Sequence, residues 1–274
     1  MRLAHLHLPN TTPFTRVSAL QQALTTRFLT HKRLSSPSPQ DPIRTCNSIQ
    51  QTPPPPPDPT IITFTPNPVY TTGRRDLPPL EHLSTRPTKP LAATASRTNS
   101  RTTHALGAKP GEGGMVAYTI LDLKRLNLTP RCHIRVLENS VIDLLKQYGV
   151  NGFVTEDPGV WVSDKTGSGS SSVPPKKITA VGVHLRRNIS SFGIGLNVTE
   201  EPMWYFRQIV ACGLEGKEAT SLEGVGVTGV GIDEVAAAFV ERFVERVNED
   251  FACKKGDGEK IEEVYPVKEE DLLL

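Results

Sequence analysis

Two side chains in the second half of the chain could carry out covalent chemistry together. Cys212 stands in the segment "QIVACGLEGKEATSL", between an apolar run and Gly213. Unpaired cysteine is most often a small buried hydrophobe, but a glycine directly after it favours a loop or a strand end, where the sulfur is accessible. Lys177 stands earlier, at the start of "KKITAVGVHLR". A lysine near a thiol favours the nucleophilic thiolate and can transfer protons.

The same lysine has a simpler interpretation. Lys176 and Lys177 open a predicted strand, and lysine side chains at strand ends are usually solvated. Without further context, the solvated alternative is favoured. Only a fold that brings Lys177 close to Cys212 favours the chemical interpretation.

Glycines on two neighbouring predicted strands form a second candidate feature. The segments "KKITAVGVHLR" and "SFGIGLNVT" alternate like antiparallel strands joined around residues 186–190, and they carry Gly182, Gly193 and Gly195. Because no helix is expected after Gly195, the Gly-x-Gly pattern does not predict dinucleotide binding. Glycines inside strands instead leave room for a ligand or a second backbone. The two strands therefore predict the wall of a slot for a thin apolar group.

The elements that must position these residues are most clearly predicted after Met115. "MVAYTILDL" is typical of a strand, and "TPRCHIRVLENSVIDLLKQYGV" predicts a helix with Thr129 as its cap, Pro130 in its first turn and Gly149 as its stop. A further strand is expected in "GVWVSD", and "IDEVAAAFVERFVERVNEDF" carries the apolar stripe of a second helix. We therefore expect an α/β (α+β) fold, with a mixed sheet flanked by helices.

Composition divides the chain into segments. Residues 35–59 are rich in proline, and residues 91–113 are mostly small, polar and basic. We expect residues 1–34 to be either a strand and helix of the folded domain or a transit-like segment, followed by a Pro-rich loop at 35–59. Residues 60–90 are expected to form a strand and loop of the domain, and residues 91–113 a low-complexity, disordered stretch. The domain core is expected at 114–252 and a charged C-terminal tail at 253–274. The first segment has two interpretations because it lacks acidic residues, as mitochondrial transit segments do, yet alternates like a strand and then a helix.

Charge and cysteine usage exclude several classes of function. The 31 basic and 29 acidic residues give a net charge of +2, and the basic residues are scattered, so we expect no nucleic-acid partner. No run approaches the roughly 20 apolar residues of a membrane span. The spacing of the four cysteines is that of neither a zinc site nor a disulfide scaffold, so we expect no metal and reduced thiols in an intracellular compartment: Cys46, Cys132, Cys212 and Cys253.

Several segments resemble, in order and approximate spacing, the lipoyl(octanoyl) transferase family and its mitochondrial members in particular. They are "PNPVYTTGRRD", "MVAYTILDLKRL", "DPGVWV", "KKITAVGVHLRR", "SFGIGLNV" and "IVACGLEGKEATSL". The resemblance implies the α/β catalytic domain shared with biotin and lipoate protein ligases. It also implies a mitochondrial enzyme that moves an octanoyl group from acyl carrier protein to a lysine of a lipoyl domain. The implied partners are lipoyl domains of 2-oxoacid dehydrogenases and the glycine cleavage H protein.

The resemblance also implies roles for individual residues. Cys212 matches the nucleophile that carries the acyl thioester, and Lys177 matches the lysine that lowers the pKa of the cysteine and transfers protons. Two segments match substrate contacts: Ala180, Val181, Gly182, and Gly193, Ile194, Gly195. Exchange between thioesters is close to isoenergetic and aminolysis to an amide runs downhill, so the reaction implies no ATP and no cofactor. The lack of a glycine-rich phosphate loop in the sequence agrees with that chemistry.

The chain departs from the family pattern before "VAYTILDL". The family carries an Arg-Gly-Gly segment and a His-Gly-Pro-Gly-Gln segment there, whereas this chain has "SRTTHALGAKPGEGGMVAY", in which His104 is the one counterpart and takes over no role. Phe192 stands where many relatives have histidine. Two alternatives therefore remain open. One is an inactive relative or truncated gene model that keeps the fold and binding only. The other is an ATP-dependent lipoate-protein ligase, which activates the acid as an adenylate and needs no nucleophilic thiol.

Overall fold

A mixed eight-stranded sheet forms the centre of the computed structural model, which describes residues 1–35, 55–67, 113–163, 174–206, 217–249 and 256–273. The strands lie in the order β4-β5-β6-β7-β3-β2-β1-β8. Their bounds are β1 (Arg2–Thr12), β2 (Thr60–Pro66), β3 (Gly114–Ile120), β4 (Gly152–Phe153), β5 (Val160–Val162), β6 (Lys176–Arg186), β7 (Ile189–Asn197) and β8 (Glu263–Pro266). In this part of the chain β1 pairs in parallel with β2 and β8, and the other neighbours are antiparallel. The predicted fold class is confirmed.

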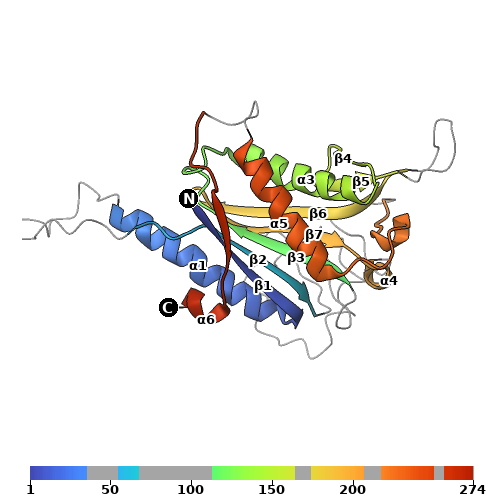
Figure 1. Cartoon of the computed structure of the whole chain (residues 1–274), viewed down its shortest axis with the longest axis horizontal. Coiled ribbons are helices and arrows are strands. Elements are labelled where there is room, and N and C mark those ends of the chain that lie inside the picture. The colour runs from blue at the N-terminus through green and yellow to red at the C-terminus, as the bar shows by residue number, and fades with distance from the viewer. Residues whose placement is uncertain (36–54, 68–112, 164–173, 207–216, 250–255, 274) are drawn as a thin grey trace, which may run out of the picture.

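Helices cover both faces of the sheet (Figure 1). On one side lie α1 (Phe14–Ser35) and the short α6 (Glu269–Leu273), and on the other lie α3 (Pro130–Gln147) and α5 (Ile232–Asn248). We call these sides the α1 face and the α3/α5 face. The short α4 (Glu201–Phe206) and the 3₁₀ turn η4 (Glu223–Val225) follow β7 in the chain.

Strand alternation divides the apolar side chains between two cores. Successive side chains in a strand point to opposite faces, so one strand can supply both cores. In β3, Val116 and Tyr118 pack in the cluster with α1, whereas Met115 and Ala117 pack in the cluster with α3 and α5. The centre of the sheet is therefore buried on both sides, which fixes the register of β3.

Helix α3 begins and ends as its sequence predicts. The hydroxyl of Thr129 accepts a hydrogen bond from the backbone N–H of Cys132 at 3.1 Å, and Pro130 opens the first turn, where a backbone donor is not needed. Gly149 follows the helix with a φ of 72°, a conformation that glycine adopts without steric cost. The predicted helix near the C-terminus is present as α5.

The two ends of the chain lie side by side in the sheet. Residues 1–34, for which the sequence left two interpretations, form β1 and most of α1, and β1 lies between β2 and β8. The expected tail at residues 253–274 contains β8, which pairs with β1, and α6, whose Leu272 packs in the α1 cluster. The sequence pattern did not predict β8 because Glu263–Pro266 is short and mostly exposed, and its place depends on β1.

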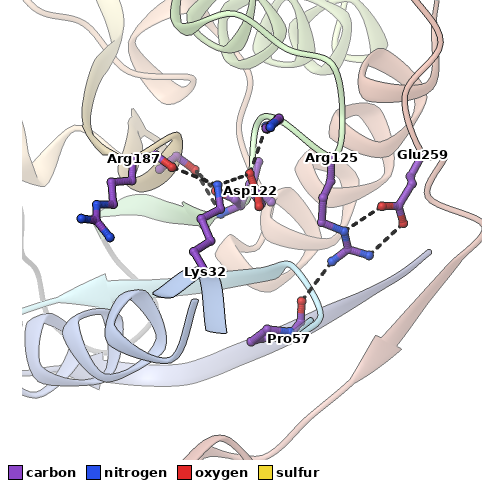
Figure 2. Close-up of polar contacts among 9 residues, drawn as sticks. Lys32, Pro57, Asp122, Arg125, Arg187 and Glu259 are labelled. Atoms are coloured by element: carbon purple, nitrogen blue, oxygen red, sulfur yellow. Dashed lines mark hydrogen bonds and ion pairs between the residues drawn. The ribbon is translucent and has the colours of Figure 1, made fainter. Parts of the chain in front are cut away.

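Polar contacts tie both ends to the turn that follows β3 (Figure 2). The ammonium of Lys32, near the end of α1, lies 2.7 Å from Asp122 and donates to the carbonyl of Arg187 at 2.9 Å. Arg125 forms two 2.8 Å hydrogen bonds with the carboxylate of Glu259 and donates to the carbonyl of Pro57. Bidentate pairs of this kind fix geometry as well as charge.

Candidate active site

A bulge in β6 decides which face Lys177 occupies. Val160 pairs with Thr179, but the next residue of β5, Trp161, pairs with Lys177, so Ile178 is an extra residue in β6. Val160 packs in the α3/α5 core, and Lys177 and Trp161 therefore point to the opposite face.

The side chain of Lys177 is held by a carbonyl group and an aromatic ring. Its ammonium donates to the carbonyl oxygen of Pro158 at 3.0 Å and lies 4.7 Å from the ring centroid of Trp161. A cation above an indole face is attracted by the ring quadrupole. Trp161 is itself buried, and its indole N–H donates to the carbonyl of Asp157 at 3.3 Å. Lys177 is therefore half-buried and oriented by the turn between β4 and β5.

Residues 218–220, which come a few positions after Cys212 in the sequence, run alongside Lys177. The backbone N–H of Lys177 donates to the carbonyl of Glu218 at 2.8 Å, and its carbonyl accepts from the N–H of Thr220 at 2.9 Å. These bonds form a parallel bridge between Lys177 and Ala219. Lys217 forms an ion pair with Asp157 and lies 5.3 Å from the ring of Trp161. Cys212 itself lies outside the described residues.

The two predicted substrate segments face each other across β6 and β7. Three pairs are in direct register: Ala180 with Gly195, Val181 with Ile194, and Gly182 with Gly193. The prediction that these strands are antiparallel neighbours is confirmed. By alternation, the alanine and the three glycines share the α1 face with Lys177, whereas the side chains of Val181 and Ile194 pack against the α3/α5 core. On the α1 face, the surface beside Lys177 is therefore made of very small residues, which we call the glycine rows: Ala180, Gly182, Gly193 and Gly195.

Gly193 is required by a second backbone. A Cβ atom built on it would lie inside 3.0 Å of the carbonyl oxygen of Ala117 in β3, closer than real Cβ atoms approach. A strand glycine can leave room for a ligand or for a second backbone, and at Gly193 it leaves room for the backbone of β3. Its absence of a side chain allows β3 and β7 to pair.

Phe192 has a conformation that sequence reasoning missed. Its φ is 63°, which is rare for a bulky residue, and its ring packs edge-on against Tyr118 at 5.4 Å. Strand alternation would place this side chain on the same face as Ile194, but its contact with Tyr118 is on the α1 face. The buried Gln21 of α1 accepts the backbone N–H of Phe192 at 2.6 Å and so supports this conformation. An aromatic ring consequently lies next to the glycine rows.

His133 and Cys132 belong to α3, which covers the opposite face of the sheet from the glycine rows. His133 of α3 is fully buried, burial lowers its pKa to about 4, and its Nε2 lies 3.3 Å from the hydroxyl of Thr119. Cys132 takes part in a disulfide in the structure, so the expectation of four reduced thiols is wrong for this residue.

The described residues contain neither a cluster of metal ligands nor a membrane-spanning helix. No group of three or more His, Cys, Asp or Glu residues gathers there as metal ligands. Within the same ranges, no helix has the length and apolar character to cross a membrane.

The family model of the lipoyl protein ligase A/B catalytic domain matches residues 47–244. The "Probable octanoyltransferase" of Schizosaccharomyces pombe is 36% identical over 215 residues, covering 78% of this chain and 82% of the relative. The chain belongs to the octanoyltransferase family. The mitochondrial octanoyl-[acyl-carrier-protein]:protein N-octanoyltransferase of Danio rerio is 34% identical over 191 residues, covering 69% of this chain and 77% of the relative. The resemblance stated from the quoted motifs is confirmed.

Solved structures confirm the fold of this octanoyltransferase family member. Protein Ta0514 of T. acidophilum, a "putative lipoate protein ligase", aligns with a TM-score of 0.53 at 14% identity, covering 99% of this chain and 92% of the other. At this identity the likeness shows the fold alone.

Proposed function

We propose that this protein transfers an octanoyl group from acyl carrier protein to a lysine of a lipoyl domain, through a thioester on Cys212. Family membership supports the substrates, since the name of the Danio rerio relative states an octanoyl-carrier donor and a protein acceptor. The sequence supports the chemistry, because a nucleophilic cysteine removes the need for an activated adenylate.

The proposed reaction has two steps. In each step one bond to the carbonyl carbon of the octanoyl group forms and another breaks. The Cys212 thiolate attacks the thioester carbonyl, the bond to the carrier sulfur breaks, and the leaving thiolate takes a proton from the Lys177 ammonium. The amine of the acceptor lysine then attacks the Cys212 thioester, Lys177 accepts the proton that the amine loses, and Cys212 leaves as a thiolate. Lys177 thus alternates between general acid and general base.

The observation that carries this proposal is the bridge between Lys177 and Ala219. Lys217 is the first described residue after the gap that contains Cys212, and its ammonium shares the ring of Trp161 with that of Lys177. Five residues of chain span at most about 17 Å, so covalent geometry keeps Cys212 within that distance of Lys217.

We propose that the acyl chain binds along the glycine rows. They share a sheet face with Lys177, and none of them carries a side chain larger than a methyl group. Val181 and Ile194 contribute backbone groups to this surface, because their side chains pack into the opposite core. We expect Phe192 to lie at the end of the rows away from Lys177, since it pairs with Val183.

A mitochondrial location and lipoyl-domain partners complete the proposal. The relatives from Danio rerio and Kluyveromyces lactis are named as mitochondrial enzymes, while bacterial octanoyltransferases are similar as well. The proposed acceptors are lipoyl domains of 2-oxoacid dehydrogenases and the glycine cleavage H protein. Expression of a fluorescently tagged full chain, imaged beside a mitochondrial marker, tests the location, and a diffuse cytoplasmic signal would contradict it.

Transfer of octanoate to an isolated lipoyl domain tests the activity. The purified chain is incubated with octanoyl-acyl carrier protein and the lipoyl domain in the absence of ATP, and the domain is weighed by mass spectrometry. We expect an octanoylated domain with the natural chain and none with Cys212→Ser. Transfer that persists in Cys212→Ser would contradict the thioester route.

The same assay separates the two alternatives. The departure from the family motifs before Met115 favours an inactive relative, for which no transfer occurs with or without ATP. A lipoate-protein ligase would use free octanoate and require ATP.

A further inference from the structure

A buried carboxylate in α3 reaches the turn that orients Lys177. Glu138 is 3% exposed, and one of its oxygens accepts the backbone N–H of Gly159 at 3.1 Å. Its other oxygen lies 3.2 Å from the guanidinium of Arg135, which is half-exposed. Burying a carboxylate is costly unless its oxygens are hydrogen-bonded, so the hydrogen bond from Gly159 stabilises the buried Glu138 carboxylate.

The turn that Glu138 holds is packed directly against β6. Gly159 has a φ of 126°, and a Cβ atom on it would lie inside 3.0 Å of the carbonyl oxygen of Thr179 and 3.4 Å from Cε of Lys177. The residue before it, Pro158, supplies the carbonyl that accepts the Lys177 ammonium at 3.0 Å. The position of that carbonyl therefore depends on the placement of the Gly159 peptide group.

Glu138 contacts neither Lys177 nor the glycine rows in these hydrogen bonds; it acts through the turn. We propose that Glu138 is a positioning residue, which fixes the Lys177 ammonium by anchoring the N–H of Gly159 so that the Pro158 carbonyl faces the lysine. This inference rests on the proposed function, because it assigns a consequence to the position of Lys177. Loss of the anchor leaves a buried N–H without a partner, and the turn then relaxes to satisfy it.

Three substitutions test the anchor. Glu138→Leu removes the acceptor, Glu138→Gln keeps an oxygen for Gly159 without the charge, and Leu144→Ala, in the core of the same helix, destabilises without touching the turn. All are assayed below their unfolding temperatures. If Glu138→Leu does not yield folded protein, Glu138→Asp, which shortens the side chain by one methylene, takes its place.

The first measurement is the pH profile of Cys212 alkylation by iodoacetamide, resolved by peptide mass spectrometry. We expect Glu138→Leu to slow alkylation about 10-fold near neutral pH and to move the profile to higher pH, as a misplaced lysine no longer favours the thiolate. Glu138→Gln should stay within about threefold of the natural chain, and Leu144→Ala should keep the natural profile. A Glu138→Leu profile identical to that of Leu144→Ala would overturn the proposal.

The second measurement is the rate at which an amine-acetylating reagent labels Lys177. We expect labelling to rise severalfold in Glu138→Leu and to stay unchanged in Glu138→Gln and Leu144→Ala. This rate separates the inference from the proposed function. If Lys177→Ala leaves Cys212 alkylation unchanged, the proposed role of Lys177 fails, and the labelling rate still decides whether Glu138 positions the lysine. Equal labelling in all variants would overturn the inference.

Discussion

At the scale of single residues, Gly193 is a position where one added carbon should destabilise the sheet. A Cβ atom there would collide with the carbonyl oxygen of Ala117, a backbone atom that cannot move without parting β3 from β7. We expect Gly193→Ala to lower the free energy of unfolding by about 2–3 kcal/mol. Urea denaturation followed by circular dichroism measures the change.

Gly231 supplies the control for that substitution. It precedes α5 with a φ of −75°, and a Cβ atom on it would have no neighbour within 4 Å. We expect Gly231→Ala to cost less than about 1 kcal/mol. Equal losses at the two glycines would show that close approach of β3 is not the reason for Gly193.

A second residue-scale prediction concerns Lys177. If its ammonium sustains the Cys212 thiolate, Lys177→Ala slows alkylation of Cys212 near neutral pH, and raising the pH restores much of the rate because hydroxide then removes the thiol proton. Lys176→Ala is the matched control, since Lys176 pairs with Glu218 at the exposed start of the same strand. If Lys177→Ala leaves the alkylation profile unchanged, Lys177 is a solvated charge that does not act on Cys212.

Sequence motifs single out candidate side chains, but not the contacts that support them. Cys212, Lys177 and the glycine rows were singled out because a Cys-Gly pair, strand glycines and segments that resemble the family are local signals, and their roles stay proposals. The roles of Glu138 and Phe192 depend on contacts with residues far away in the chain, Gly159 and Gln21. No local pattern carries such information, because the bulge at Ile178 and the positive φ of Phe192 change which face a side chain occupies.

At the scale of elements, the first 34 residues give a decisive prediction. They form β1, which lies between β2 and β8, and most of α1, whose buried residues pack on the sheet. Removing them separates β8 from its only described partner strand and exposes the α1 core. We therefore expect a chain of residues 35–274 to lose cooperative thermal unfolding. A sharp transition in that chain would instead favour the interpretation of this segment as transit-like.

The cap of α3 gives a smaller and more local prediction. Thr129→Ala removes the acceptor for the N–H of Cys132 and should cost about 1 kcal/mol of unfolding free energy, while Thr129→Ser should restore it. Thermal melts of the three chains measure the difference. No loss in Thr129→Ala would mean that packing alone sets the start of α3.

Elements with strong periodicity were predicted, and short edge elements were not. Helices α3 and α5 each bury a stripe of one face, which their sequences display. Strand β8 has four residues and gains its pairing from β1, almost a full chain length away. Its formation is a tertiary effect that a local pattern does not predict.

At the scale of the whole molecule, the buried His133 and the half-buried His5 should make stability depend on pH. Burial lowers the pKa of His133 to about 4, and burial together with His7 lowers that of His5 to about 4. The unfolded chain binds more protons than the folded one between these values and 6.5. The free energy of unfolding therefore falls as pH drops from 6.5 to about 4, by about 3 kcal/mol for His133 alone.

Chemical denaturation at several pH values checks this dependence. In His133→Gln the slope between pH 6.5 and 4 should be clearly smaller, because the substituted amide does not titrate. An identical slope in both chains would show that other groups cause the acid sensitivity.

The proposed mechanism requires that Cys212 carries the acyl group. Its most direct test is to incubate the full chain with octanoyl-acyl carrier protein alone, quench in acid, digest, and locate octanoate by peptide mass spectrometry. We expect an octanoyl thioester on the peptide that contains Cys212, which hydroxylamine removes, and it should form without ATP and more slowly in Lys177→Ala. Octanoate absent from that peptide, while the lipoyl domain is still modified in the complete assay, would contradict it.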